Sequence, residues 1–237
     1  MQSEVAQLPL SHRLYGWFET NKKQVLWGGS IVAGLVLIIC FFNWNKSQRE
    51  IAASEALSDV STAQFGNPGA RPDADGYLKV AANYPKSSAG ARALLLAAGS
   101  LFAGGKFPEA KTQFERFTRE HHDSPLMGQA LLGIAACWDA QGKTNEAVAA
   151  YKNLVDHHPG ETVIPQAKFA LARLYEAQGK VEQARVYYEE INRNEPYGSL
   201  GSEAGMRLEE LLVKNPALVP KPETAGTNTI PFGVPKR

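Results

Sequence analysis

The sequence contains little cysteine and almost no net charge. Cys40 and Cys137 are the only cysteines in 237 residues, and Cys137 stands beside Trp138 in a helical pattern. We therefore expect no disulfide, and the cysteines do not indicate whether the protein lies in an oxidising or a reducing compartment. Twenty-five basic residues balance 24 acidic ones, and no basic stripe with interleaved aromatic residues is present. We therefore expect no nucleic-acid partner.

Motifs that carry catalysis are also missing. The sequence has no nucleophile elbow, phosphate-binding loop, zinc-binding helix or dinucleotide fingerprint. The pairs His121-His122 and His157-His158 are the best candidates for metal binding, but no carboxylate and third ligand stand in register with them, and histidine is favoured at helix C-termini. We expect no enzyme activity, no catalytic, cofactor-binding or metal-binding residues, no cofactor and no small-molecule substrate. An enzyme or metal carrier acting through the histidines is the weaker alternative.

The sequence does contain one repeated pattern. Gly-Lys pairs at 105, 142 and 179 recur at an interval of 37 residues, which is typical of a stacked repeat array. Small alanines at equivalent positions fit where two helices approach closely, and large rings fill the layer between hairpins. The pattern predicts helical hairpins with the glycine in the turn. The superimposed residues are Ala110, Ala147 and Ala184; Phe114, Tyr151 and Tyr188; Ala93, Ala130, Ala167 and Ala204; Ala98, Ala135 and Ala172; and Leu101, Trp138, Tyr175 and Leu212.

Prolines in the same register set the limits of the repeats. Pro85, Pro159 and Pro196 end the second helix of each hairpin, because proline cannot continue the helical hydrogen-bond ladder. We predict a degenerate first hairpin over 47–85, broken by the Gly- and Pro-rich stretch 66–72. Repeats over 88–122, 125–159 and 162–196 follow, and then a capping helix over 200–214. Glu209 replaces an alanine of the earlier units, so we expect the outer face of the cap to meet water.

An uncharged stretch precedes the repeats. Residues 25–44 are long enough, at about 20 residues, to cross a hydrocarbon core as a helix. Trp27 and Trp44 stand at its ends as aromatic membrane anchors, bracketed by lysines. Helical character continues from residue 45 to residue 65. A cleaved signal peptide is disfavoured because no small-residue cleavage site follows. A lipoprotein would require acylation of Cys40, where the preceding Ile39 is bulky.

The flanking segments complete the predicted all-α organisation. Basic residues before the span favour a cytoplasmic N-terminal segment over 1–24, with the repeats in the periplasm of a bacterium with two membranes. Residues 14–18 could lie on the inner membrane surface, or the segment is a frayed tail. The solenoid occupies 45–216. We expect residues 217–237 to be disordered, although Ile230–Pro235 could dock on a partner.

The repeat resembles the tetratricopeptide repeat over Ser47–Pro216, in a longer variant similar to that of bacterial envelope proteins. The order of parts resembles the family of ancillary Sec-translocon subunits with a periplasmic tetratricopeptide domain. That resemblance implies a single-pass bacterial inner-membrane protein that binds proteins near the Sec translocon, with periplasmic chaperones, and acts on emerging envelope proteins. Two alternatives stay open: a lipoprotein of the outer-membrane barrel-assembly type, and a scaffold for a cell-envelope enzyme.

The resemblance also implies a binding groove lined by the first helix of each hairpin. Apolar bulk with a polar rim suits an amphipathic or unfolded client peptide. The variant of this repeat that clamps carboxylates has lysine and asparagine where this chain has Leu95, Leu132 and Phe169, so recognition of an acidic C-terminus is not implied. Alternatively, these side chains only pack between helices. The predicted groove residues are Arg92, Leu95, Phe102, Gln129, Leu132, Asp139, Gln166, Phe169, Arg173 and Glu176.

Overall fold

The computed structural model describes residues 21–65 and 73–218. The predictions for the N-terminal segment 1–20, the helix break at 66–72 and the tail after residue 218 lie outside these ranges. The described residues are helical with no strand, as the all-α prediction required. The chain divides into two compact units, residues 1–93 and 94–237.

One long helix dominates the first unit. Helix α2 runs without interruption from Lys22 to Phe65, so the predicted span and the helix after it are continuous. Its Ser30–Ala63 part is long and apolar enough to cross a membrane, and its most apolar window is not buried. Trp27 and Trp44 are 74% and 63% exposed. This is the surface expected of a helix whose neighbours would be lipid.

The second part of α2 is packed. Helix α3 (Ala74–Asn83) lies against it and buries Tyr77, Val80 and Ala81. Ala53 of α2 is fully buried. Helix α4 (Ser88–Ala103) begins in this unit, and the carboxylate of Glu50 on α2 accepts hydrogen bonds from the Ser88 and Ala89 N–H groups at 2.9 and 3.0 Å. These are orphan donors of a first helical turn, so α2 supplies the N-terminal cap of α4.

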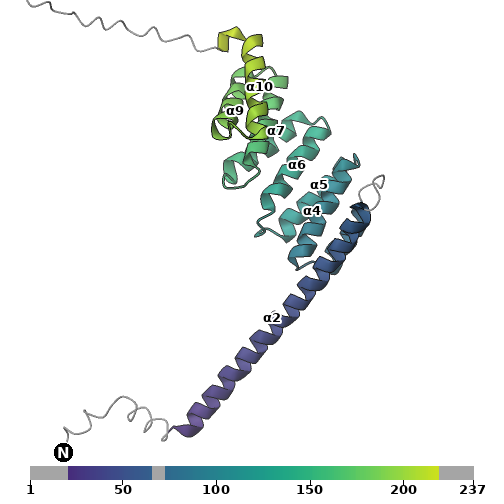
Figure 1. Cartoon of the computed structure of the whole chain (residues 1–237), viewed down its shortest axis with the longest axis vertical. Helices are drawn as coiled ribbons and strands as arrows, with labels where there is room; N and C mark the ends of the chain where they lie inside the picture. Colours follow the sequence, from purple (N-terminus) through teal and green to yellow (C-terminus); the bar gives the residue numbers. More distant parts are fainter. Residues whose placement is uncertain (1–20, 66–72, 219–237) are drawn as a thin grey trace, which may run out of the picture. The chain divides into compact units, whose positions relative to one another are not determined.

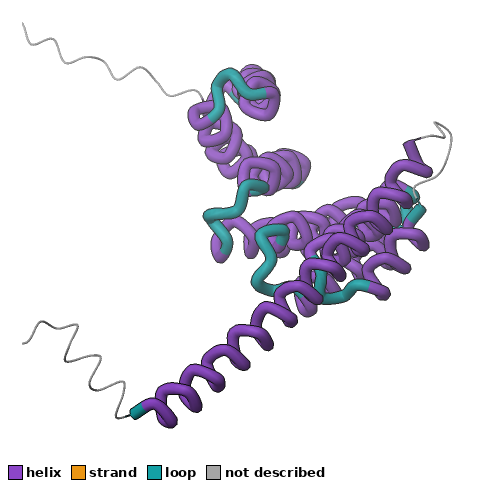
Figure 2. Tube along the Cα trace, turned by 60° about the horizontal axis from the view of Figure 1, so that its bottom comes forward, coloured by secondary structure: helices purple, strands orange, loops and turns teal. Residues whose placement is uncertain are grey.

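The second unit is a run of short helices in which each contacts the next (Figure 1). Short loops join consecutive helices (Figure 2). The order is that of stacked hairpins, and the all-α solenoid is confirmed. The helices are α5 (Phe107–Glu120), α6 (Met127–Ala140), α7 (Thr144–His157), α8 (Ile164–Ala177), α9 (Val181–Asn194) and α10 (Ser199–Lys214), followed by the 3-10 turn η2 (Pro216–Leu218).

The three repeated glycines occupy the predicted turns. Gly105, Gly142 and Gly179 have φ values of 74°, 70° and 71°. A Cβ atom at any of them would meet nothing within 4 Å, so the requirement for glycine is conformational and not steric. In each turn the lysine N–H after the glycine donates to the carbonyl five residues earlier, at 2.9 to 3.0 Å. This 6→1 bond is the Schellman termination that satisfies a free helix carbonyl.

The predicted core rows are buried. The alanines of the three aligned rows are all at 0% exposure, and the rings of Phe114, Tyr151 and Tyr188 are at 8%, 4% and 0%. The row after them is less uniform, because Leu101 and Tyr175 are buried while Trp138 and Leu212 are half-buried. Alanine therefore marks the closest helix approaches throughout the repeats, as its size predicts.

The first helices of the repeats do not all start at the position that the 37-residue period predicts. α4 and α10 have 16 residues, whereas α6 and α8 have 14 and start two register positions later than the predicted 125 and 162. At Gly90 and Gly201 a Cβ would lie 2.0 and 1.8 Å from the carbonyl oxygens of Tyr84 and Glu195. Only glycine permits that approach. The equivalent residues of α6 and α8 are Met127 and Ile164, so these two helices start later.

Candidate functional site: the face of the first helices

The predicted groove residues lie on the first helix of each hairpin, with different exposures. Arg92, on the part of α4 in the first unit, is exposed. In the second unit, Gln129, Gln166 and Arg173 are exposed, Leu95, Phe102, Leu132, Asp139 and Glu176 are half-buried, and Phe169 is buried. On α6 and α8 spacings of three, four and seven residues place the predicted positions on one helix face, which we call the binding face after the prediction.

An ion pair connects the binding faces of α6 and α8. Arg173 Nη2 lies 3.4 Å from Asp139 Oδ2, across 34 residues of sequence. Both side chains are only partly shielded, with 51% and 26% exposure. The two faces are therefore neighbours where Asp139 and Arg173 meet.

Two predicted groove residues turn toward the hairpin interior. The Phe169 ring packs edge-on against Tyr188 of α9, with 5.7 Å between centroids. The Tyr188 hydroxyl donates to Glu176 Oε2 at 3.1 Å. Burial, together with the nearby Glu176 carboxylate, raises the pKa of Tyr188 well above its usual range. Phe169 and Glu176 thus hold α8 on α9, and they contribute less to the open surface than Gln166 and Arg173.

The apolar part of the binding face is modest. Leu132 packs against the buried core cluster while staying half-exposed. Phe102 contacts Phe107 edge-on at 5.2 Å, across the turn from α4 to α5. The predicted positions thus combine half-buried apolar side chains with exposed glutamine and arginine side chains.

Sequence reasoning missed that α10 extends the same face. Continuing the 37-residue register places Glu203, Met206, Glu210 and Val213 on the rows of Gln166, Phe169, Arg173 and Glu176. Met206 and Val213 are 65% and 75% exposed, far more than the apolar residues of the binding face on α6 and α8. The 37-residue register is the sequence signal for these positions.

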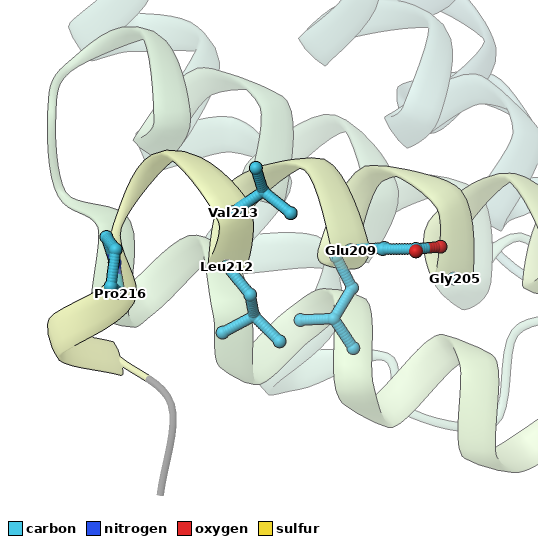
Figure 3. A pocket seen from close by; sticks show the side chains of 6 residues that line it. Gly205, Glu209, Leu212, Val213 and Pro216 are labelled. Carbon is cyan, nitrogen blue, oxygen red and sulfur yellow. The ribbon is translucent and has the colours of Figure 1, made fainter.

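The cap prediction holds only in part. Glu209 is exposed, as expected for an outer face that meets water. Beside it, however, lies an open groove of about 410 Å³ whose lining is largely apolar (Figure 3). Among the described residues only the turn η2 (Pro216–Leu218) follows α10, so no described helix follows it to cover these side chains. The groove residues are Gly205, Leu208, Glu209, Leu212, Val213 and Pro216.

The histidines and the buried thiol have local partners. The His121 ring lies 5.0 Å from Phe117, and burial lowers the pKa of His121. His122 Nε2 lies 3.0 Å from Asp123 Oδ2 on the surface. Burial raises the pKa of Cys137 to about 11, which keeps its thiol protonated and unreactive at neutral pH. Within residues 21–65 and 73–218, no group of three or more His, Cys, Asp or Glu side chains is placed to hold a metal ion.

Several solved structures resemble this chain. A tetratricopeptide repeat protein from Parabacteroides merdae is 15% identical, with a TM-score of 0.53 over 69% of this chain and 61% of that one. A thermophilic TPR protein from Thermus thermophilus is 16% identical, with a TM-score of 0.47 over 71% and 99%. PcrH from Pseudomonas aeruginosa is 19% identical, with a TM-score of 0.46 over 53% and 93%. At these identities the likeness concerns the fold alone. A search of curated proteins finds no match.

Two family models match the sequence. Residues 140–197 match the tetratricopeptide repeat, which covers the complete hairpin of α8 and α9. Residues 16–153 match the tetratricopeptide repeat-like domain. The second match takes in the apolar segment and the first hairpins together, and it covers more than half of the 237 residues. The chain therefore belongs to the tetratricopeptide repeat-like domain family.

Proposed function

We propose that this protein is a membrane-tethered, non-enzymatic binding module of the bacterial inner membrane. It would act near the Sec translocon with periplasmic chaperones, holding emerging envelope proteins. The family supplies the general part of this proposal, since repeats of this kind act in protein–protein interaction. The sequence resemblance supplies the specific part, and the observations below support it.

The observation that carries the proposal is the continuity of α2. Its first part exposes an apolar surface that includes Trp27 and Trp44, and its second part is packed against α3. Glu50, between these parts, caps α4. A helix of this kind has no flexible linker between a membrane-spanning part and the first hairpin. The protein would therefore hold its first hairpin at the membrane surface.

Tethering determines what affinity is needed. A binder fixed beside the exit site of a translocon meets its client at an effective concentration on the order of millimolar. The binding face offers exposed Gln129, Gln166 and Arg173 around a half-buried Leu132. A surface of this kind suits weak, tolerant contacts with extended or amphipathic segments, which is what a holder of many clients requires.

Chemical crosslinking in native membranes tests the identity of the partners. The full chain, carrying an affinity tag before Lys22, would be crosslinked in intact membranes and purified under denaturing conditions. We expect translocon subunits or a periplasmic chaperone among the products. Recovery of outer-membrane assembly proteins alone would contradict the proposal and favour the barrel-assembly alternative.

Sidedness and processing have separate tests. Protease added to spheroplasts should degrade the repeats and spare an N-terminal tag, whereas the opposite pattern would place the repeats in the cytoplasm. Mass spectrometry of the purified protein should find Met1–Lys23 intact. An acylated Cys40 at a new N-terminus would replace the transmembrane anchor with a lipid one, and would require a cut through α2.

A further inference from the structure

The groove on α10 lies where a complete repeat would place its second helix. The residues of α8 equivalent to Leu208, Glu209 and Leu212 are Leu171, Ala172 and Tyr175, and these are buried at 0%, 0% and 8%. α9 packs extensively against α8, but α10 is followed among the described residues only by the turn η2. The α10 groove is thus the half of a repeat interface that no described helix fills.

The sequence after α10 lacks the pattern of another repeat helix. By register, residues 218–231 would correspond to α9. They carry Lys221, Ala225 and Asn228 where α9 buries Ala184, Tyr188 and Ile191. Pro222 also stands inside this stretch, where it would interrupt a helix. The register therefore does not predict a regular second helix over the apolar groove.

We infer that the segment Ile230–Val234 of the C-terminal tail binds in the α10 groove. Ile230, Phe232 and Val234 alternate with Pro231 and Gly233, so an extended backbone would direct the three apolar side chains to one side. They are the largest apolar residues beyond Val219. Leu208, Leu212 and Val213 offer a matching apolar surface that water otherwise covers.

The length of the tail permits this contact. The described chain leaves α10 through Pro216, which itself lines the groove (Figure 3). Ile230 stands twelve positions after Leu218, and an extended chain of that length spans up to about 40 Å. The 16 residues of α10 measure about 24 Å. The segment can therefore reach any point of the groove, and its covalent attachment supplies an effective concentration near the millimolar range.

Charge also favours this occupant. Arg207 and Lys214 both pair with Glu210, at 3.7 and 2.7 Å. Glu209 lines the groove and forms no ion pair with another described residue. Lys236 and Arg237 follow the apolar segment directly, and basic residues of the tail outnumber its single acidic residue, Glu223. The tail thus brings positive charge to a groove that carries an uncompensated carboxylate.

Disulfide trapping in the full chain, purified in detergent, tests the assignment. Val213→Cys and Gly233→Cys would be combined with Cys40→Ser, while Cys137 is left in place because it is buried. Val213 is exposed and lines the groove, and Gly233 adjoins Phe232 without replacing an apolar residue. The control pairs Gly233→Cys with Ala149→Cys, an exposed position on α7 outside the groove. Mild oxidation of dilute protein is followed by non-reducing electrophoresis.

We expect an intramolecular disulfide that forms at least about ten times faster in the groove pair than in the control pair, the difference that about 1.4 kcal/mol of binding would give. Adding Phe232→Asp to the groove pair should reduce the rate to that of the control. Equal rates for the two pairs would overturn the inference. A disulfide found mainly in dimers would also overturn it, and would assign the groove to a second copy of the chain.

Discussion

Helices α8 and α10 carry the same repeat pattern but differ in what covers them. In α8, Leu171 and Ala172 are fully buried against neighbouring helices. In α10, the equivalent Leu208 and Glu209 line an open groove. The comparison shows that the repeat period decides which residues face the next element, whereas burial depends on whether that element follows in the chain. Among the described residues of the second unit, the incomplete last repeat therefore leaves an apolar groove without a packed second helix.

The largest expected effect is the difference in stability loss between substitutions of the equivalent residues Leu171 and Leu208. Leu171→Ala empties a fully buried position and should reduce the free energy of unfolding by about 3 kcal/mol. Leu208→Ala truncates a partly buried side chain and should cost about 1 kcal/mol. Urea unfolding of each full-length variant in detergent, followed by far-UV circular dichroism, measures both. Similar losses would mean that the α10 groove is as well covered as the interior of the complete hairpin.

The glycines with positive φ in the hairpin turns should matter for stability, whereas a loop glycine without positive φ should not. Gly142→Ala places a side chain at φ 70° and should destabilise the protein by about 1–2 kcal/mol. Gly160→Ala is the matched control, because a Cβ there meets nothing within 4 Å and its φ is not positive. The control should change stability by less than about 0.5 kcal/mol. Thermal unfolding of the two variants gives the comparison, and equal shifts would refute the conformational explanation.

The Tyr188 hydroxyl donates a hydrogen bond to Glu176. The last repeat lacks this bond, because its residue equivalent to Glu176 is Val213. Tyr188→Phe should lower stability at pH 7 by about 1 kcal/mol, since it removes the hydrogen bond and keeps the ring packing. Tyr197→Phe, at a fully exposed ring, should have no effect. A loss equal to that of the control would show that the hydroxyl contributes nothing.

The pH dependence of stability at this position follows from the pKa of Tyr188. Folding raises the pKa of Tyr188 above the value of about 10 that it has when unfolded, so the unfolded chain releases this proton first. Its contribution is therefore fully present below pH 10 and is lost as the pH rises further, by up to about 1.4 kcal/mol per pH unit. The stability of Tyr188→Phe should fall less steeply between pH 10 and 11. An unchanged slope would contradict this.

The smallest effect on stability should come from the ion pair on the binding face. Arg173→Ala and Asp139→Asn each leave a partly exposed partner that water can solvate, so each should cost about 0.5 kcal/mol or less. The effect should shrink further at high salt. Unfolding at low and high ionic strength measures it. A loss of several kcal/mol would mean that the pair is structural and that this face is not free to bind.

Much of this architecture could be predicted from the 37-residue period, because alanine size, turn glycines and terminal prolines act locally. The start of α6 at Met127 could not be predicted from the period. An earlier start, as in α4 and α10, needs a close approach to a preceding carbonyl that Gly90 and Gly201 tolerate and a larger residue does not. For Phe169 and Glu176 the sequence left open whether they line the groove or pack between helices, because their inward direction depends on Tyr188 across the hairpin. The exposure of Met206 and Val213 escaped because a helical pattern does not say whether a neighbour follows.

Site-specific photocrosslinking in native membranes tests the central claim most directly. A photoreactive residue would replace exposed Gln166 on the binding face of α8, and in a matched variant exposed Gln183 on α9. We predict protein adducts from position 166 and few or none from position 183, with adducts at 166 reduced in the Arg173→Ala background. Equal labelling from the two positions would contradict the claim that the first helices of these hairpins bind protein partners.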